Sequence, residues 1–290
     1  MSLAILAQWC ALSADASVII ITDEAQNDLA KKIARDIPNP CTIMHYEKRM
    51  PRLKKLRPHD LVIALLSFDT FMQGACCTFS PFGKPKGLKA KYAFIRLGIS
   101  EESLLQGLST PKELVYDKIA ELHKFKSGSK LRVTNPAGTD ITLTIDGFGT
   151  YSHEIIADGG IAFLPPSETS AEVKSADGVI AVDVTVGQLY YNETLLGQFG
   201  LVKEPVMITV KNGVVIDIAG NDELKQKLFA LPSECRKLEE LGHGLSDMQP
   251  TGLIGVDESI IHTCHFGIGD GGNCGVHLDV VASQPAIVEI

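Results

Sequence analysis

The first third of the chain alternates short, mostly apolar runs with helical patterns. Four of the runs are expected to be strands: residues 18–22, 41–46, 61–67 and 92–99. Residues 18–22 are a β-branched run, and residues 61–67 form a continuous apolar stretch typical of a buried strand. A helical pattern over residues 24–36 stops just before Pro38, and Pro111 opens another helix that is expected to end near Gly128. Strands that alternate with helices in this way predict a mostly parallel sheet with helices on its faces.

The pattern changes after Gly128, where the apolar runs become short and are separated by Gly and Asn turns. Five of these runs are expected to be strands: residues 131–133, 140–145, 178–186, 206–210 and 214–219. Asn212-Gly213 is a strong hairpin signal, and a helix is expected over about residues 222–241, broken or kinked at Pro232. The sequence therefore predicts an α/β scaffold domain over residues 1–127, followed by a mostly antiparallel, β-rich domain over residues 128–290.

Composition narrows the class of protein. Hydrophobic residues make up 45% of the chain and charged residues 21%, which is typical of a globular protein. The net charge of −8 disfavours nucleic acid and anionic membranes as partners, and the longest apolar run, residues 61–66, is too short to cross a bilayer. The seven cysteines are odd in number and lack zinc-finger spacing, which suits reduced thiols. A cytoplasmic protein is expected.

The predicted parallel sheet lacks the signatures of a nucleotide site. The turn after the first strand, residues 22–26, contains no glycine, so it cannot form the Gly-x-Gly-x-x-Gly loop that lets a pyrophosphate approach backbone amides. The chain also has no Gly-Lys-Ser/Thr loop. The first domain is therefore interpreted as a scaffold.

Candidate chemistry is concentrated towards the C-terminus, where four of the eight histidines lie between His243 and His277. His277 and Asp279 are two residues apart, so on a strand both project from the same face and can reach one ion. An imidazole with a carboxylate is a common ligand pair for Zn²⁺, Mn²⁺, Co²⁺ or Fe²⁺. His262 and His265 are three residues apart, so on a strand they face opposite sides and only one of them is expected to join the metal site.

Each of these signals also has a purely structural interpretation. His277 and Asp279 fit a hydrogen-bonded pair on a strand. Glu168 fits a cap of a turn or helix, and Glu239 with Glu240 fits a solvated helix end. Spacing alone leaves a metal site and a structural role open.

The order of the motifs along the second half of the chain adds a further indication. A Glu precedes a Gly-His-Gly segment at residues 240–244, and a Thr-Gly-Leu segment precedes an acidic pair at residues 251–258. A His is followed by spaced glycines at residues 265–269, and an Asn-x-x-x-His-x-Asp segment closes the series at residues 273–279. A Pro-Pro-Ser-Glu segment lies upstream at residues 165–168. The series resembles the thermophilic-type metallo-aminopeptidases, the leucyl aminopeptidase-like aminopeptidase T and aminopeptidase S family. The resemblance spans residues 128–290 well and the first domain weakly.

The resemblance implies an α/β domain followed by a β-rich metal-binding domain. It also implies a set of metal ligands: Glu168, Glu240, His265, His277 and Asp279. The family uses, in addition, a Tyr shortly after the His that matches His265, and residues 269–272 here contain none. A second ion would therefore have one ligand fewer. His243, on an expected flexible Gly-His-Gly turn beside Glu240, is a candidate for proton transfer or substrate contact, or else a surface loop histidine.

The expected function is that of an aminopeptidase-like hydrolase, which removes N-terminal amino acids from peptides with a water activated by Zn²⁺, Co²⁺ or Mn²⁺. The alternative is a mononuclear non-haem Fe²⁺ dioxygenase that opens a hydroxylated aromatic ring, because the chain also resembles the related dihydroxypyridine dioxygenases. His265, His277 and Asp279 would then form the facial ligand set. A binding protein that has kept the fold without the metal is the third possibility. The expected partner is a small-molecule or peptide substrate, and the resemblance makes a homodimer plausible.

Overall fold

The computed structural model describes residues 2–47, 53–72, 79, 84–150, 158–192, 194–269 and 275–290. The chain divides into two compact units, each built from two stretches of sequence. The first unit consists of Met1–Thr110 with Tyr151–Ser167, and the second consists of Pro111–Thr150 with Glu168–Ile290. Among the described residues, no helix is both long and apolar enough to cross a membrane.

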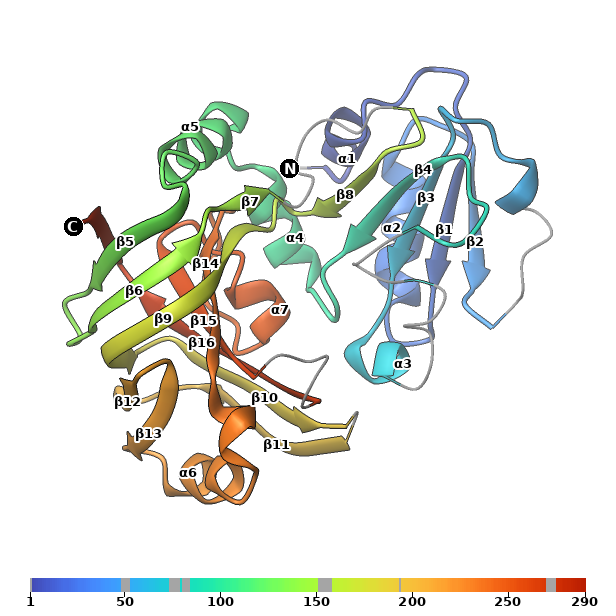
Figure 1. The fold of residues 1–290 in the computed structure, drawn as a ribbon. Coiled ribbons are helices and arrows are strands. Elements are labelled where there is room, and N and C mark those ends of the chain that lie inside the picture. The colour runs from blue at the N-terminus through green and yellow to red at the C-terminus, as the bar shows by residue number, and fades with distance from the viewer. Residues whose placement is uncertain are drawn as a thin grey trace. The chain divides into compact units, whose positions relative to one another are not determined.

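The first unit is built on a five-stranded sheet in the order β2-β1-β3-β4-β8, in which every pair is parallel. Its strands are β1 (Val18–Thr22), β2 (Cys41–His45), β3 (Leu61–Leu65), β4 (Lys91–Ile95) and β8 (Ile161–Leu164). The described helices are α1 (Ile5–Trp9), α2 (Asn27–Asp36), the short 3₁₀ helix Leu53–Lys55, α3 (Phe68–Met72) and α4 (Glu101–Leu108). Figure 1 shows β8 returning to lie beside β4, although the two are far apart in sequence.

The second unit is built on antiparallel strands, of which nine follow one path in the order β11-β10-β16-β15-β14-β9-β6-β5-β17 (Figure 1). In chain order the strands are β5 (Ser127–Thr134), β6 (Asp140–Asp146), β7 (Gly149–Thr150), β9 (Glu168–Val182), β10 (Thr185–Tyr191), β11 (Thr194–Leu201), β12 (Val206–Lys211), β13 (Val214–Ala219), β14 (Leu238–Gly244), β15 (Thr263–Ile268), β16 (Val276–Ser283) and β17 (Ala286–Glu289). The described helices are α5 (Lys112–Leu122), α6 (Asp222–Phe229), the 3₁₀ helix Ser233–Arg236 and α7 (Ile254–Asp257). The expected fold class, a parallel α/β part and a β-rich antiparallel part, is confirmed.

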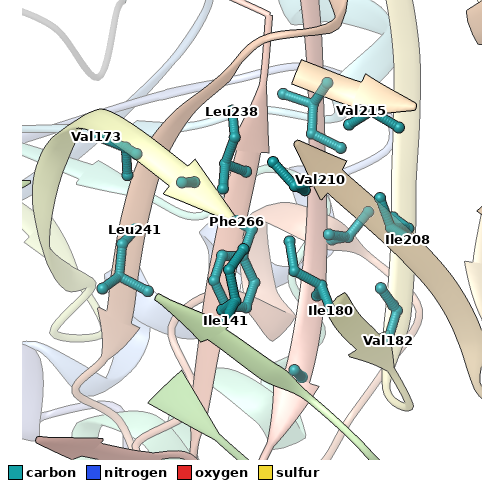
Figure 2. Close-up of a cluster of buried hydrophobic side chains, with 14 of the residues drawn as sticks. Ile141, Val173, Ile180, Val182, Ile208, Val210, Val215, Leu238, Leu241 and Phe266 are labelled. Carbon is teal, nitrogen blue, oxygen red and sulfur yellow. The ribbon is translucent and has the colours of Figure 1, made fainter. Parts of the chain in front are cut away.

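The core of the second unit lies against one face of this sheet. Figure 2 shows its centre, where side chains from the strands β6, β9, β14 and β15 and from the β12–β13 hairpin interdigitate: Ile141, Val173, Ile180, Val182, Ile208, Val210, Val215, Leu238, Leu241 and Phe266. Successive residues of a strand face opposite sides, so burying one face leaves the alternate residues free to carry polar chemistry on the other.

The division into units differs from the single boundary expected between residues 127 and 128. Helix α5 belongs with the second unit, and residues 151–167 return to the first. The return supplies β8, which pairs with β4 from Tyr92 opposite Ile161 to Ile95 opposite Leu164. Glu168, the first residue of β9, therefore stands where the chain re-enters the second unit.

The prediction of a helix over residues 222–241 is wrong for the second half of that range. Asn221 does cap a helix, because its side chain accepts a hydrogen bond from the Leu224 amide, but α6 ends at Phe229. The strand β14 begins at Leu238. Leu238 and Leu241 are both buried in the core although they are three residues apart, because a β-bulge between Leu238 and Glu240 inserts an extra residue. That spacing imitates a helical repeat.

Candidate metal centre

The residues that the sequence predicts as metal ligands lie on one face of four adjacent strands, β9, β14, β15 and β16. Phe266 and Ile268 of β15, with Leu278 and Val280 of β16, point into the core. The alternate residues of the same strands therefore project from the opposite face. In the observed register, all five predicted ligands are on this opposite face: Glu168 on β9, Glu240 on β14, His265 on β15, and His277 and Asp279 on β16.

Glu168, Glu240 and His265 form the tightest part of this arrangement. The Nε2 atom of His265 lies 2.8 Å from Oε2 of Glu168 and 3.9 Å from Oε1 of Glu240. His265 is buried, whereas the side chain of Glu240 keeps 31% of its surface exposed. The cluster thus has a buried nitrogen donor and one carboxylate that solvent can reach.

Glycines make room for these contacts. Gly242 lies opposite His265, and a Cβ atom there would be only 2.1 Å from Nε2 of the imidazole. Gly267 lies between Glu240 and Asp279, and its Cβ would be 3.3 Å from Oε2 of Glu240 and 3.2 Å from Oδ1 of Asp279. The two carboxylates therefore converge over a residue without a side chain.

His277 and Asp279 form an ion pair on the same face, with 2.7 Å between Nε2 and Oδ2. Asp279 is buried, while 51% of the His277 side chain is exposed. The Asp279 carboxylate, opposed by burial and supported by Glu240 and Glu258, raises the pKa of His277 to about 9. The pair is thus electrostatically linked to Glu240.

Burial disfavours a charged imidazole at His265, but the carboxylates of Glu168 and Glu240 outweigh burial and raise the pKa of His265 well above its ordinary value. The other ring nitrogen, Nδ1, is buried and has no hydrogen-bond partner among the described residues. This negatively charged cluster stabilises a cation, either a proton or a metal ion.

The donor set fits a divalent metal ion. One ligand atom from each of Glu168, Glu240 and His265 lies within 4.8 Å of the others. Metal–oxygen and metal–nitrogen bonds of roughly 2.0–2.2 Å place two ligands of one ion up to about 4.4 Å apart, so small side-chain rotations suffice. Two carboxylates and an imidazole suit Zn²⁺, Mn²⁺, Co²⁺ or Fe²⁺.

His243 lies away from this cluster. Residues 242–244 are part of β14 and do not form a turn, and Gly242 shares the face of His265, so His243 projects to the opposite side. Burial lowers its pKa to about 4, and its Nδ1 lies 2.8 Å from the Gly244 carbonyl oxygen. The interpretation of His243 as a proton-transfer group near Glu240 is therefore corrected: it is a buried histidine on the core side.

The other histidine of the motif, His262, is exposed and precedes β15, so only His265 reaches the cluster, as expected from their spacing. Residues 270–274, which include Asn273 of the closing motif, lie outside the described residues.

Asp257 is a buried carboxylate whose role the sequence did not reveal. It accepts hydrogen bonds from the amide and hydroxyl of Thr251, from the amide of Gly252 and from the hydroxyl of Thr185 on β10. It therefore fastens the segment before α7 to the sheet. The only sign of it in the sequence is that Asp257 belongs to the acidic pair that follows the Thr-Gly-Leu segment.

No family model matches the chain, and no curated protein matches it. The solved structures similar to it include two that match nearly its whole length. The structure of 2,5-dihydroxypyridine dioxygenase from Pseudomonas putida KT2440 is 15% identical, covers 99% of this chain and 92% of its own, and has a TM-score of 0.62. Wild-type AmpT from Thermus thermophilus is 15% identical, with 99% and 94% covered and a TM-score of 0.55. At this identity the likeness shows a shared two-part fold.

Proposed function

We propose that the second unit is the catalytic part of a metal-dependent hydrolase of the aminopeptidase kind. The observation that carries the proposal is the carboxylate-rich cluster: Glu168 and Glu240 surround His265, and Asp279 approaches Glu240 over Gly267. Such a set, richer in carboxylates than in imidazoles, is better suited to a Lewis-acid ion that activates water than to a two-histidine iron site. The similarity to AmpT is consistent with this choice at the level of the fold.

The ion would be held by Glu168, Glu240 and His265, with Asp279 and His277 adjacent. When bound, it would polarise a peptide carbonyl and lower the pKa of a bound water. The chain's own residues would position the ion and the substrate. His265 is fixed by burial, while Glu240 and His277 are exposed enough to meet a substrate. We expect Zn²⁺, Co²⁺ or Mn²⁺, with one ion held tightly and a second loading only when metal is added.

The direct test is to titrate metal-free protein with Zn²⁺, Mn²⁺ or Co²⁺ while assaying the hydrolysis of dipeptides. Release of N-terminal amino acids should require the metal and should rise further with the second equivalent. His262→Ala, at an exposed position outside the cluster, should behave like the unmodified protein.

A ring-cleaving dioxygenase is the second candidate, because His265, His277 and Asp279 supply two imidazoles and one carboxylate on one face of adjacent strands. The likeness to the Pseudomonas putida dioxygenase agrees with it at the level of the fold. If no metal supported hydrolysis, and Fe²⁺ supported O₂ uptake with a dihydroxylated aromatic, the hydrolase proposal would be wrong and this one would replace it.

A further inference from the structure

The strand β10, next to β16 in the sheet, contains an irregularity beside the candidate metal centre. Opposite β16, Val186 pairs with Val280 and Tyr190 pairs with His277, so β10 uses one more residue than its partner over this interval. Val186 and Leu189, three residues apart, both lie in the core. The irregularity is therefore a β-bulge, which reverses the facing of the residues that follow.

The bulge decides where Tyr190 points. Gly187 follows Val186, whose side chain lies in the core, so Gly187 lies on the ligand face. Regular alternation from Gly187 would send Tyr190 into the core. With the bulge, Leu189 and Tyr191 pack on the core side instead, and Tyr190 projects from the ligand face. Bulges recur beside active sites, where they re-aim side chains.

Tyr190 is thereby placed within reach of the centre. It is the cross-strand partner of His277, and directly paired residues have Cβ atoms about 5 Å apart on the same face. Tyr190 is partly exposed, but its hydroxyl oxygen is buried. A phenol extends far enough from its Cβ to pass over a neighbouring strand, and its hydroxyl is a neutral hydrogen-bond donor near pH 7.

We propose that Tyr190 is a further catalytic residue of this centre, whose hydroxyl donates a hydrogen bond to the reacting carbonyl oxygen of a peptide substrate. This inference rests on the proposed function. The charged groups on the ligand face are mostly carboxylates, which accept hydrogen bonds and repel a developing oxyanion. A phenol beside His277 adds a neutral donor to this face, and a donor aimed at the oxyanion stabilises it most strongly in the transition state.

Two variants separate this role from a structural one. Tyr190→Phe removes only the hydroxyl on the ligand face, and Tyr191→Phe makes the same change on the core side. In metal-loaded protein, Tyr190→Phe should lower kcat for dipeptide hydrolysis by about 10²–10³-fold, the usual effect of losing one oxyanion donor, with bound metal and KM little changed. Tyr191→Phe should stay within about twofold of the unmodified protein, far below the loss expected for an oxyanion donor. Unchanged kcat in Tyr190→Phe, or loss of its metal, would overturn the donor role.

A second measurement locates Tyr190 without any assay of activity. The protein would be labelled with 3-fluorotyrosine and its ¹⁹F spectrum recorded with Zn²⁺ and with paramagnetic Co²⁺, the signals of Tyr190 and Tyr191 being identified by their loss in the two variants. Co²⁺ should shift or broaden the Tyr190 signal more than the Tyr191 signal. An unaffected Tyr190 in cobalt-loaded protein would overturn this inference alone. Failure to bind either metal would overturn the proposed function and this inference with it.

Discussion

At Gly242 and Gly267 the sheet carries no side chain on the face where His265 and the carboxylates meet. Glu240 and Asp279 face each other across Gly267, and the ring of His265 lies over Gly242. The sequence offered both glycines as parts of motifs, but their role depends on strand register. Residue types and the family resemblance could single out the candidate ligands. The glycine gaps that let them converge could not be derived from spacing.

Gly242→Ala should weaken metal binding by about tenfold or more, in the range seen when residues that support metal ligands are changed. The added Cβ would lie 2.0–2.1 Å from ring atoms of His265, so the imidazole must move. Gly255→Ala is the matched control, because a Cβ at Gly255 meets nothing within 4 Å. Isothermal titration of both metal-free variants with Zn²⁺ measures the effect, and equal affinities would contradict this account of the glycine.

In the first unit, Asp60 provides a pH-dependent contribution to stability. Its carboxylate is buried, which by itself raises its pKa. Hydrogen bonds from the Arg57 side chain and from the backbone amides of Ser17 and Arg57 outweigh this, and the pKa falls from 3.8 to about 2. A carboxyl group with a lowered folded-state pKa stabilises the fold above its unfolded pKa, and that stabilisation is lost as the pH falls towards 2.

Asp60→Asn should therefore lower the free energy of unfolding at pH 7 by about 1–3 kcal/mol, because buried donors lose a charged acceptor. The difference from the unmodified protein should shrink between pH 4 and pH 2. Denaturant unfolding at a series of pH values measures it. A difference that stays constant down to pH 2 would show that the carboxylate charge is not what stabilises this site.

At the scale of elements, two β-bulges explain where the sequence misleads. The bulge in β14 makes Leu238 and Leu241 look helical, so the helix that starts at Asn221 was extended too far. The bulge in β10 makes the facing of Tyr190 unpredictable from alternation. The strands β1 and β3 and the β12–β13 hairpin were predictable, because their apolar pattern and the Asn212-Gly213 turn agree with the fold.

A buried carboxylate, Asp257, helps to hold the segment between β14 and α7. Asp257→Asn replaces an acceptor of four hydrogen bonds by an amide that cannot accept all of them, so unfolding should become easier by about 1–3 kcal/mol. Thr185→Ser, which keeps the hydroxyl donor on β10, is the control and should change stability less. Chemical denaturation reports both, and an unchanged midpoint for Asp257→Asn would contradict this role.

At the scale of the molecule, the two-part fold followed from the change of pattern near Gly128, but the way the chain is divided did not. The return of residues 151–167 to the first unit depends on β8 adding to a parallel sheet, a long-range pairing that leaves no local signal. The candidate centre lies within the second unit alone, assembled from β9, β14, β15 and β16. Residues far apart in sequence meet there because these strands are neighbours.

The central claim, that this face of the second unit binds a divalent metal ion, is tested most directly by the metal stoichiometry of metal-free protein titrated with Zn²⁺. We expect one tightly bound ion, greatly weakened binding in His265→Ala and in Asp279→Asn, and unaltered binding in the exposed control His262→Ala. The variants should keep the circular dichroism spectrum of the unmodified protein. Absence of stoichiometric binding in the unmodified protein, or native affinity in His265→Ala, would contradict the account.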